Sequence, residues 1–261
     1  AGARDGLEEA YKALVAAYQK GDTTIDIMGL SRGAAIALDF ANLIHDDGIR
    51  HPDSDQVIAR DVPIRFVGLW DVVGAFGIPF GQLVFQRLNL GHKLRVPPNV
   101  QYPYHALALD ERRQSFRPTR QLNAYEVWFR GVHSDVGGGN GNTGLASIAL
   151  RWMLCKAKAA ELPIVDDKLS ACDALMKPDA ALVHPKDVVA NAYREFWDGD
   201  RVHYTVSERA GHHNVPAQCA RVSEADERTA MLRAKLPKRT PPRRTSAKLD
   251  AIPSYFVGLT D

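Results

Sequence analysis

Residues 29–33 read Gly-Leu-Ser-Arg-Gly, which places a serine between two glycines. The stretch 23–28 before them is short and β-branched, as in a strand. Residues 32–44 after them are apolar on nearly every side, as in a helix packed on a sheet. A tight strand-to-helix turn exposes the serine hydroxyl, and its glycines let neighbouring backbone approach closely. We therefore predict that Ser31 is a nucleophile; a turn that only starts a helix is the alternative.

A serine nucleophile needs further groups around it. The backbone N–H of Arg32 would lie at the helix N-terminus, where it can stabilise an oxyanion. A histidine must take the serine proton, and an acid must orient that histidine. In an α/β-hydrolase the chain order is serine, acid, histidine. Asp71 ends the strand-like run 62–70, so we expect its carboxylate at the same sheet edge as Ser31. Asp110, in a stretch that reads as helix, and Asp135 are the rival acids.

Nine histidines compete for the role of base. His133 follows the strand-like stretch 125–132 and begins a loop with three glycines at 137–139. A histidine on a loop just past a strand is where this fold places its base, so we predict His133. His203 is the main alternative, and His212-His213 has polar surroundings typical of the surface.

The remaining pattern favours an α/β fold of the α/β-hydrolase type, a mostly parallel sheet with helices on both faces. Residues 7–19 have helical spacing, and an apolar stripe over 145–153 predicts another helix. Strands separated by helical or long connections indicate a parallel sheet. The chain opens inside a helical pattern, and one hypothesis is that it lacks the first strands of the fold.

Composition excludes several classes of protein. The chain has 261 residues, 45% of them hydrophobic, and a net charge of +2, which gives no global attraction to nucleic acid. Its three cysteines show no metal-ligand spacing, and we interpret them as reduced thiols. No apolar run approaches the ~20 residues of a membrane span, and the start lacks the pattern of a signal peptide. We expect neither a metal nor a cofactor.

Two segments suit a lipid substrate. Residues 78–85 are strongly apolar, which fits either an acyl chain or membrane surface, or a buried core. Residues 233–248 contain seven Lys or Arg, no acids and three prolines, which is typical of an exposed basic extension. Such an extension would attract anionic headgroups and support peripheral membrane contact. We therefore predict a catalytic domain over 1–232 and a basic extension over 233–261.

Four ordered blocks, at 29–34, 68–73, 105–111 and 127–139, resemble the catalytic domain of type VI secretion phospholipase effectors, the Tle-like lipases. A looser similarity continues over 202–207. The resemblance implies an α/β-hydrolase with a triad of Ser31, Asp71 and His133 that cleaves lipid esters, most often phospholipids. It also implies synthesis in the bacterial cytoplasm, export by a type VI system, and secretion or immunity partners. The family begins with a strand ending in an Asp-Gly-Thr-type turn. This chain has none, so no second oxyanion donor is predicted.

Other interpretations stay open at this point. A general carboxylesterase would use the same triad, and a non-catalytic lipid- or protein-binding module would use the basic tail. Gly139-x-Gly141-x-x-Gly144, with Asp166 or Asp167 after a strand at 163–165, would suit a dinucleotide. Asp135, Asn140 and Asn142 offer oxygens to a cation, but without calcium-loop spacing.

Overall fold

The computed structural model describes residues 3–54, 56–74, 94–183, 193–209, 215–222 and 229–241. The apolar segment 78–85, His212-His213 and the stretch 242–261 lie outside the described residues.

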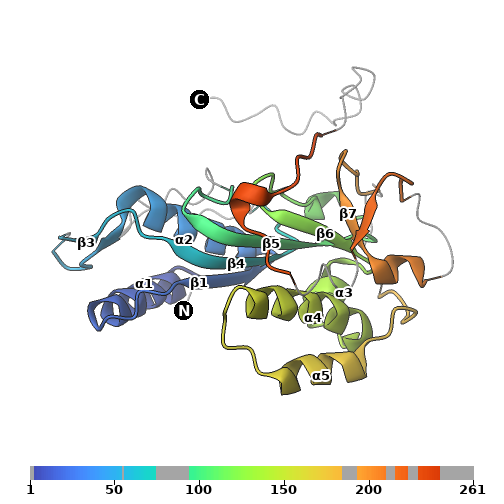
Figure 1. Cartoon of the computed structure of the whole chain (residues 1–261), viewed down its shortest axis with the longest axis horizontal. Helices are drawn as coiled ribbons and strands as arrows, with labels where there is room; N and C mark the ends of the chain where they lie inside the picture. The colour runs from blue at the N-terminus through green and yellow to red at the C-terminus, as the bar shows by residue number, and fades with distance from the viewer. Residues whose placement is uncertain are drawn as a thin grey trace.

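A six-stranded sheet in the order β1-β4-β5-β6-β7-β8 forms the centre of the molecule (Figure 1). Every neighbouring pair in it is parallel. Its strands are β1 Asp26–Leu30, β4 Ile64–Trp70, β5 Val100–Ala108, β6 Tyr125–Phe129, β7 Arg201–His203 and β8 Ala220–Val222. A separate antiparallel pair joins β2 Ile49–Arg50 to β3 Val57–Ala59. The predicted α/β class with a mostly parallel sheet is confirmed, and the carboxyl ends of its strands share one edge.

Helices cover both faces of this sheet (Figure 1). They are α1 Ala3–Gln19, α2 Arg32–Asp47, α3 His133–Gly137, α4 Thr143–Ala159 and α5 Asp166–Leu175, with 3-10 turns at Gln114–Phe116, Tyr204–Ser207 and Arg233–Lys235. The helix α2 packs on one face, and α1 lies beside it, with the Tyr11 and Phe40 rings 6.2 Å apart. The helices α3 and α4 pack on the opposite face. Among the described helices none is both long and apolar enough to cross a membrane.

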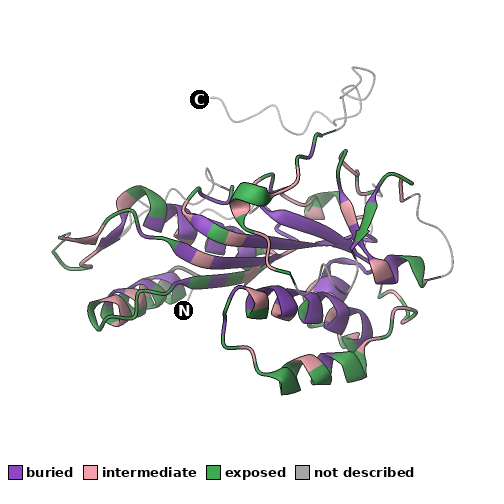
Figure 2. Cartoon of the chain, viewed as in Figure 1, coloured by how far each residue is buried: buried purple, intermediate pink, exposed green. Residues whose placement is uncertain are grey.

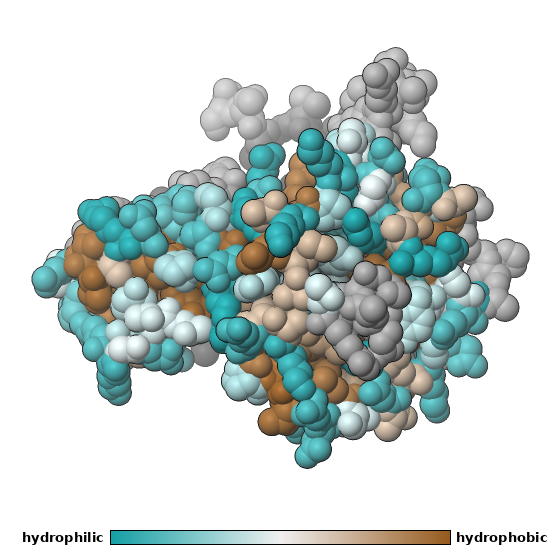
Figure 3. Space-filling model, viewed as in Figure 1, coloured by the Kyte–Doolittle hydropathy of each residue, from teal (hydrophilic) through white to brown (hydrophobic). Residues whose placement is uncertain are grey.

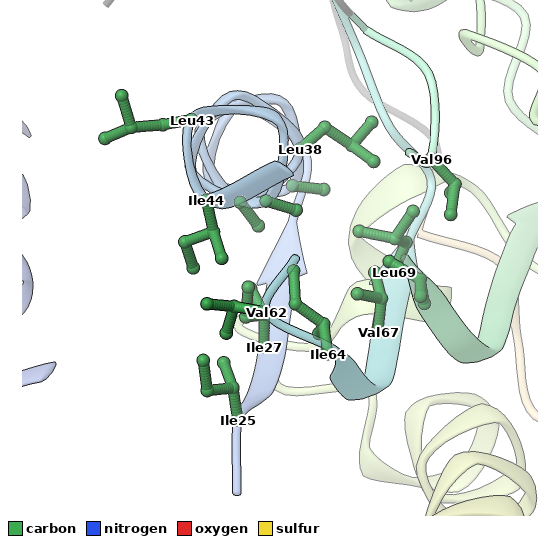
Figure 4. Close-up of a cluster of buried hydrophobic side chains, with 14 of the residues drawn as sticks. Ile25, Ile27, Leu38, Leu43, Ile44, Val62, Ile64, Val67, Leu69 and Val96 are labelled. Carbon is green, nitrogen blue, oxygen red and sulfur yellow. The ribbon is translucent and has the colours of Figure 1, made fainter. Parts of the chain in front are cut away.

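Strand β4 shows why the sheet needs both layers. Val67 and Leu69 point into one core cluster with Leu38 of α2 (Figure 4). Phe66 points the other way, into a cluster with Trp152 of α4. A strand buried on both sides reads as a continuous apolar run, which is typical of parallel sheets. Figure 2 shows the same burial along the central strands. In Figure 3, hydrophobic groups reach the visible surface both low, where Figure 1 places α4 and α5, and at the left.

Two expectations need correction. The stretch around Asp110 was expected to be helical, but residues 100–108 form β5, and Asp110 follows the strand. Tyr104 and Ala106 of β5 pack toward α4, whereas Leu107 packs in a different cluster. Side chains of this segment alternate between the two faces of the sheet, as in a strand. Pairing with β4 and β6 therefore outweighs the helix propensity of its alanines and leucines.

The stretch 229–241 differs from the exposed basic extension that the composition predicts. Thr240 pairs with Asp198 in an isolated bridge, and the Arg239 side chain is buried against Glu126. Arg233 donates to the carbonyl of Val96. These arginines are used inside the domain because buried carboxylates and carbonyls there need donors. The division at residue 232 stays a prediction.

Candidate active site

Ser31 lies between β1 and α2 at the carboxyl edge of the sheet. Its backbone has φ 58° and ψ −122°, a left-handed conformation that costs a non-glycine residue about 1–3 kcal/mol. Its N–H donates to the Trp70 carbonyl at 2.9 Å, which fixes the turn beside the end of β4. A Cβ at Gly29 would lie 2.6 Å from Ala34 Cα, so this glycine permits the close approach that we expected. A Cβ at Gly33 would meet nothing within 4 Å, so the expectation that this glycine also permits a close backbone approach is wrong.

Arg32, the predicted oxyanion donor, is the first residue of α2 and is exposed. The amide of a first helical residue has no intrahelical acceptor, so it is available to a negatively charged atom at the helix N-terminus. The Arg32 N–H therefore stays the predicted oxyanion donor.

Asp71 follows β4 and is fully buried. Its N–H donates to the Ala106 carbonyl at 2.8 Å, and its Oδ1 accepts from the Ala108 N–H at 3.1 Å. Its Oδ2 lies 2.7 Å from His133 Nδ1 and accepts from Arg194 Nη2 at 2.9 Å. Burial by itself raises the pKa of Asp71, but the charge of Arg194 and the hydrogen bond from His133 outweigh it, and the pKa is lowered.

An ionised Asp71 determines the tautomer of His133. A carboxylate only accepts hydrogen bonds, so Nδ1 of His133 must carry the proton that it shares with Asp71. In the neutral ring, Nε2 then has its lone pair free to accept a proton. This is the arrangement that a general base for a serine requires.

His133 begins the short helix α3, where a loop was expected. Its N–H donates to Glu111 Oε2 at 3.2 Å, and its ring packs edge-on against Phe116 at 4.9 Å. A Cβ at Gly137, in the same helix, would lie 2.3 Å from Leu30 Cδ1. The helix that carries His133 therefore packs directly on the residue before the predicted nucleophile.

Among the described residues no hydrogen bond joins Ser31 to His133. Such contacts are often long in ligand-free structures and tighten when substrate binds. The Ser31 carbonyl accepts from the Val73 N–H at 3.4 Å, which links the serine turn to the loop that bears Asp71. The geometry thus joins Asp71 to His133 and brings both segments alongside Ser31.

A second buried layer holds the Asp71 loop from behind. The Val72 N–H donates to His105 Nε2 at 3.1 Å, and His105 Nδ1 lies 2.8 Å from Glu126 Oε1. Since Nε2 accepts, Nδ1 must be the protonated nitrogen that donates to Glu126. Burial raises the pKa of Glu126, but Arg120, His105 and Arg239 lower it more, so the carboxyl stays ionised.

The rival acids have other roles. Asp110 Oδ2 accepts from Arg130 Nε at 2.9 Å and from the Gly131 N–H at 2.7 Å. Asp135 accepts from the Val132 N–H at 3.0 Å. Both carboxylates therefore hold the backbone just before His133 rather than its ring.

The rival base is unsuited to accepting a proton. His203 is buried, stacks on Phe129 at 4.8 Å and has Nδ1 2.8 Å from Thr205 Oγ1. Burial, with the charges of Arg151 and Lys156, lowers the pKa of His203 to about 3. A base with that pKa would hold almost no proton near neutrality.

The alternative ligand sites do not match their templates. Helix α3 separates β6 from the glycines at 139–144, and residues 163–165 form no strand, so the dinucleotide arrangement is absent from this described stretch. Asn140 and Asn142 both donate to Asp135 Oδ1, at 2.7 and 3.0 Å, which uses the oxygen that a cation would need.

Residues 49–156 match the family described as T6SS, phospholipase effector Tle1-like, catalytic domain. The predicted resemblance is confirmed over this stretch. The Tle1-like stretch contains Asp71, Glu111 and His133, while Ser31 precedes it. No curated protein matches the chain.

Two solved structures are similar to the chain. One is a crystal structure of an uncharacterized protein from Pseudomonas aeruginosa, 27% identical over 64% of this chain and 29% of that chain, with a TM-score of 0.41. The other is the Tle1 effector bound to the VgrG spike from the type 6 secretion system, 26% identical over 53% of this chain and 31% of that chain, with a TM-score of 0.39. This chain spans less than a third of the length of either.

Three residues at the site were missed by the sequence analysis. Arg194, Glu111 and His105 each contact Asp71, His133 or the loop directly after β4. His105 and Glu111 lie in a block that carries the family resemblance, which was the available signal. Arg194 lies in no motif, and its role depends on folding across 123 positions.

Proposed function

We propose that this chain hydrolyses carboxylic esters of lipids, most specifically phospholipids, through a triad of Ser31, His133 and Asp71. The observation that carries the proposal is the buried hydrogen bond between His133 Nδ1 and Asp71 Oδ2, beside a serine in a strained strand-to-helix turn. The Tle1-like match over residues 49–156 supports phospholipase activity, because the family's description names a phospholipase effector.

The proposed reaction has two halves. Ser31 Oγ attacks the ester carbonyl carbon while His133 Nε2 takes the hydroxyl proton, and the oxyanion develops toward the Arg32 N–H. Collapse breaks the ester bond, and His133 gives the proton to the departing alcohol, which leaves an acyl-Ser31. Water then attacks the acyl carbon with His133 again as base, and the fatty acid leaves as Ser31 recovers its proton. Asp71 stabilises the imidazolium in both halves.

The biological setting is part of the same proposal. One similar structure is of a Tle1 effector bound to the VgrG spike, and we infer that this chain comes from an effector exported in the same way. Its substrate would be a membrane phospholipid that it reaches as a peripheral protein. The residues of the basic stretch beyond 241 would then add attraction to anionic headgroups.

The test is release of fatty acid from phospholipid vesicles by the chain and by Ser31→Ala, both checked for folding by circular dichroism. The chain should release fatty acid and Ser31→Ala should not. Cleavage of short soluble esters without any release from vesicles would instead indicate a general carboxylesterase. Vesicle binding without turnover on any ester would indicate a binding module and overturn the proposal.

A further inference from the structure

Arg194 contacts the proposed triad acid from a distant part of the chain. Its Nη2 donates to Asp71 Oδ2 at 2.9 Å, and its Nε donates to the Glu111 carbonyl at 3.2 Å. The side chains of Arg194 and Asp71 are 4% and 0% exposed. Asp71 Oδ2 therefore accepts two hydrogen bonds, one from Arg194 and one from His133.

These contacts close a ring of four residues. Arg194 bonds Asp71, Asp71 bonds His133, the His133 N–H bonds the Glu111 carboxylate, and the Glu111 carbonyl bonds Arg194. The members lie after β4, β5 and β6 and in the segment that leads into β7, so Arg194 links that segment to the loops after β4 and β5.

The segment that bears Arg194 is itself held over the ring. The Arg112 guanidinium lies 4.6 Å from the centre of the Tyr193 ring, a cation–π contact next to Arg194. Arg194 is therefore fixed on two sides, by this contact and by the Glu111 carbonyl.

We propose that Arg194 is a positioning residue of this hydrolase, which keeps Asp71 ionised and oriented so that His133 presents Nε2 to Ser31. The inference rests on the proposed function. A fully buried carboxylate without a cation takes up a proton instead of keeping its charge. A protonated Asp71 would bind His133 Nδ1–H less strongly, and the imidazolium formed in the reaction would lose its counter-charge.

Among the described residues, the charged and titratable groups near Asp71 come from four elements or loops of the sheet edge. Arg194 and His133 face its carboxylate directly. Glu111 lies beyond them, ion-paired with Arg113, and His105 lies behind the loop, bonded to Val72. Because Arg194 supplies the largest influence that opposes burial, its removal should raise the pKa of Asp71. Protonation of the coupled His133–Asp71 pair sets the acid limb of kcat/KM, so this limb should then move to higher pH.

The experiment is the pH profile of kcat/KM on a short soluble ester for the full chain, Arg194→Met and Arg194→Lys. The matched control is Arg151→Met, since Arg151 is also a buried arginine (side chain 9% exposed) paired with an aspartate, Asp173, outside the ring. Arg194→Met should shift the acid limb upward, and Arg194→Lys, which keeps a cation, should return it toward the wild-type position. Arg151→Met should lower thermal stability and leave the limb in place.

A second readout separates this inference from the proposed function. The difference in melting temperature between wild type and Arg194→Met should narrow as pH falls toward about 4, because protonation relieves the uncompensated charge of Asp71 in the variant. If no ester is hydrolysed but the difference narrows, the coupling stands and the proposed function fails. Two results would overturn the role of Arg194. One is an acid limb of Arg194→Met at the wild-type position with activity lowered equally at every pH, and the other is a difference in melting temperature that does not change with pH.

Discussion

His133 Nδ1 lies 2.7 Å from Asp71 Oδ2, although 62 positions separate the two residues in the chain. They follow β4 and β6, which are not neighbours, and β5 lies between them. The contact forms because β5 ends at the same edge and its Ala108 N–H donates to Asp71 Oδ1. The parallel order of the strands therefore brings the two residues together at one edge of the sheet.

The strained backbone of Ser31 predicts a gain in stability when function is removed. Ser31→Gly should abolish ester hydrolysis and raise the free energy of unfolding by about 1 kcal/mol or more, because glycine adopts φ 58° without strain. Ser31→Ala should also lose activity, but its free energy of unfolding should rise less than that of Ser31→Gly. Urea denaturation of the two variants measures the difference. Equal stabilities for the two variants would mean that the turn stores no strain.

The two candidate bases predict opposite outcomes. His133→Gln should lower kcat by roughly 10⁴–10⁶-fold, since both the base and the partner of Asp71 are lost. His203→Gln should keep kcat within about tenfold, because His203 bonds Thr205 and lies outside the ring. Hydrolysis of a soluble ester by the folded variants distinguishes them. A large loss in His203→Gln with little loss in His133→Gln would reverse the assignment.

His203 also predicts the acid sensitivity of the fold. Its pKa is lowered to about 3 from 6.5, so below pH 6.5 the unfolded chain binds a proton that the folded chain does not. Stability is therefore complete above pH 6.5 and falls toward pH 3, at about 1.4 kcal/mol per pH unit for this group. Urea denaturation at a series of pH values should show this slope.

The matched variant His203→Gln should flatten the curve between about pH 6 and pH 4. Below that range the lowered pKa values of Asp71 and Glu126 take over, because their stabilising charge is lost only as pH falls under the ordinary carboxyl range. An unchanged slope in His203→Gln would contradict the burial of a neutral imidazole at this position.

The basic stretch predicts two separate effects. Arg239→Met should destabilise the fold by about 3 kcal/mol, because Glu126 would lose a buried cation. Neutralising Arg243, Arg244 and Lys248 to glutamine should leave stability unchanged and weaken binding to anionic vesicles by about fivefold per residue. Co-sedimentation with anionic and neutral vesicles measures the second effect. Equal binding of the wild type to both kinds of vesicle would show that the extension does not recognise anionic headgroups.

Much of the site could be predicted from the sequence because its signals are local. Ser31 lies in a turn whose glycine is required by a close approach to Ala34, and Asp71 and His133 follow runs that are visibly strand-like. Strand β5 was harder, because its alanines and leucines are good helix formers and only the neighbouring strands reveal the alternation. Arg194 and Arg239 had no local signal at all. Each is defined by a buried carboxylate more than 100 positions away.

We propose that Ser31 is the nucleophile and that His133, oriented by Asp71, activates it. The most direct measurement is labelling of the full chain with a fluorophosphonate, followed by peptide mass mapping of the wild type, Ser31→Ala, His133→Gln and His203→Gln. An adduct should form on the peptide containing Ser31 in the wild type and in His203→Gln, and none should form in Ser31→Ala. Labelling of His133→Gln should be strongly slowed. Labelling of another residue, or of His133→Gln at the wild-type rate, would contradict this proposal.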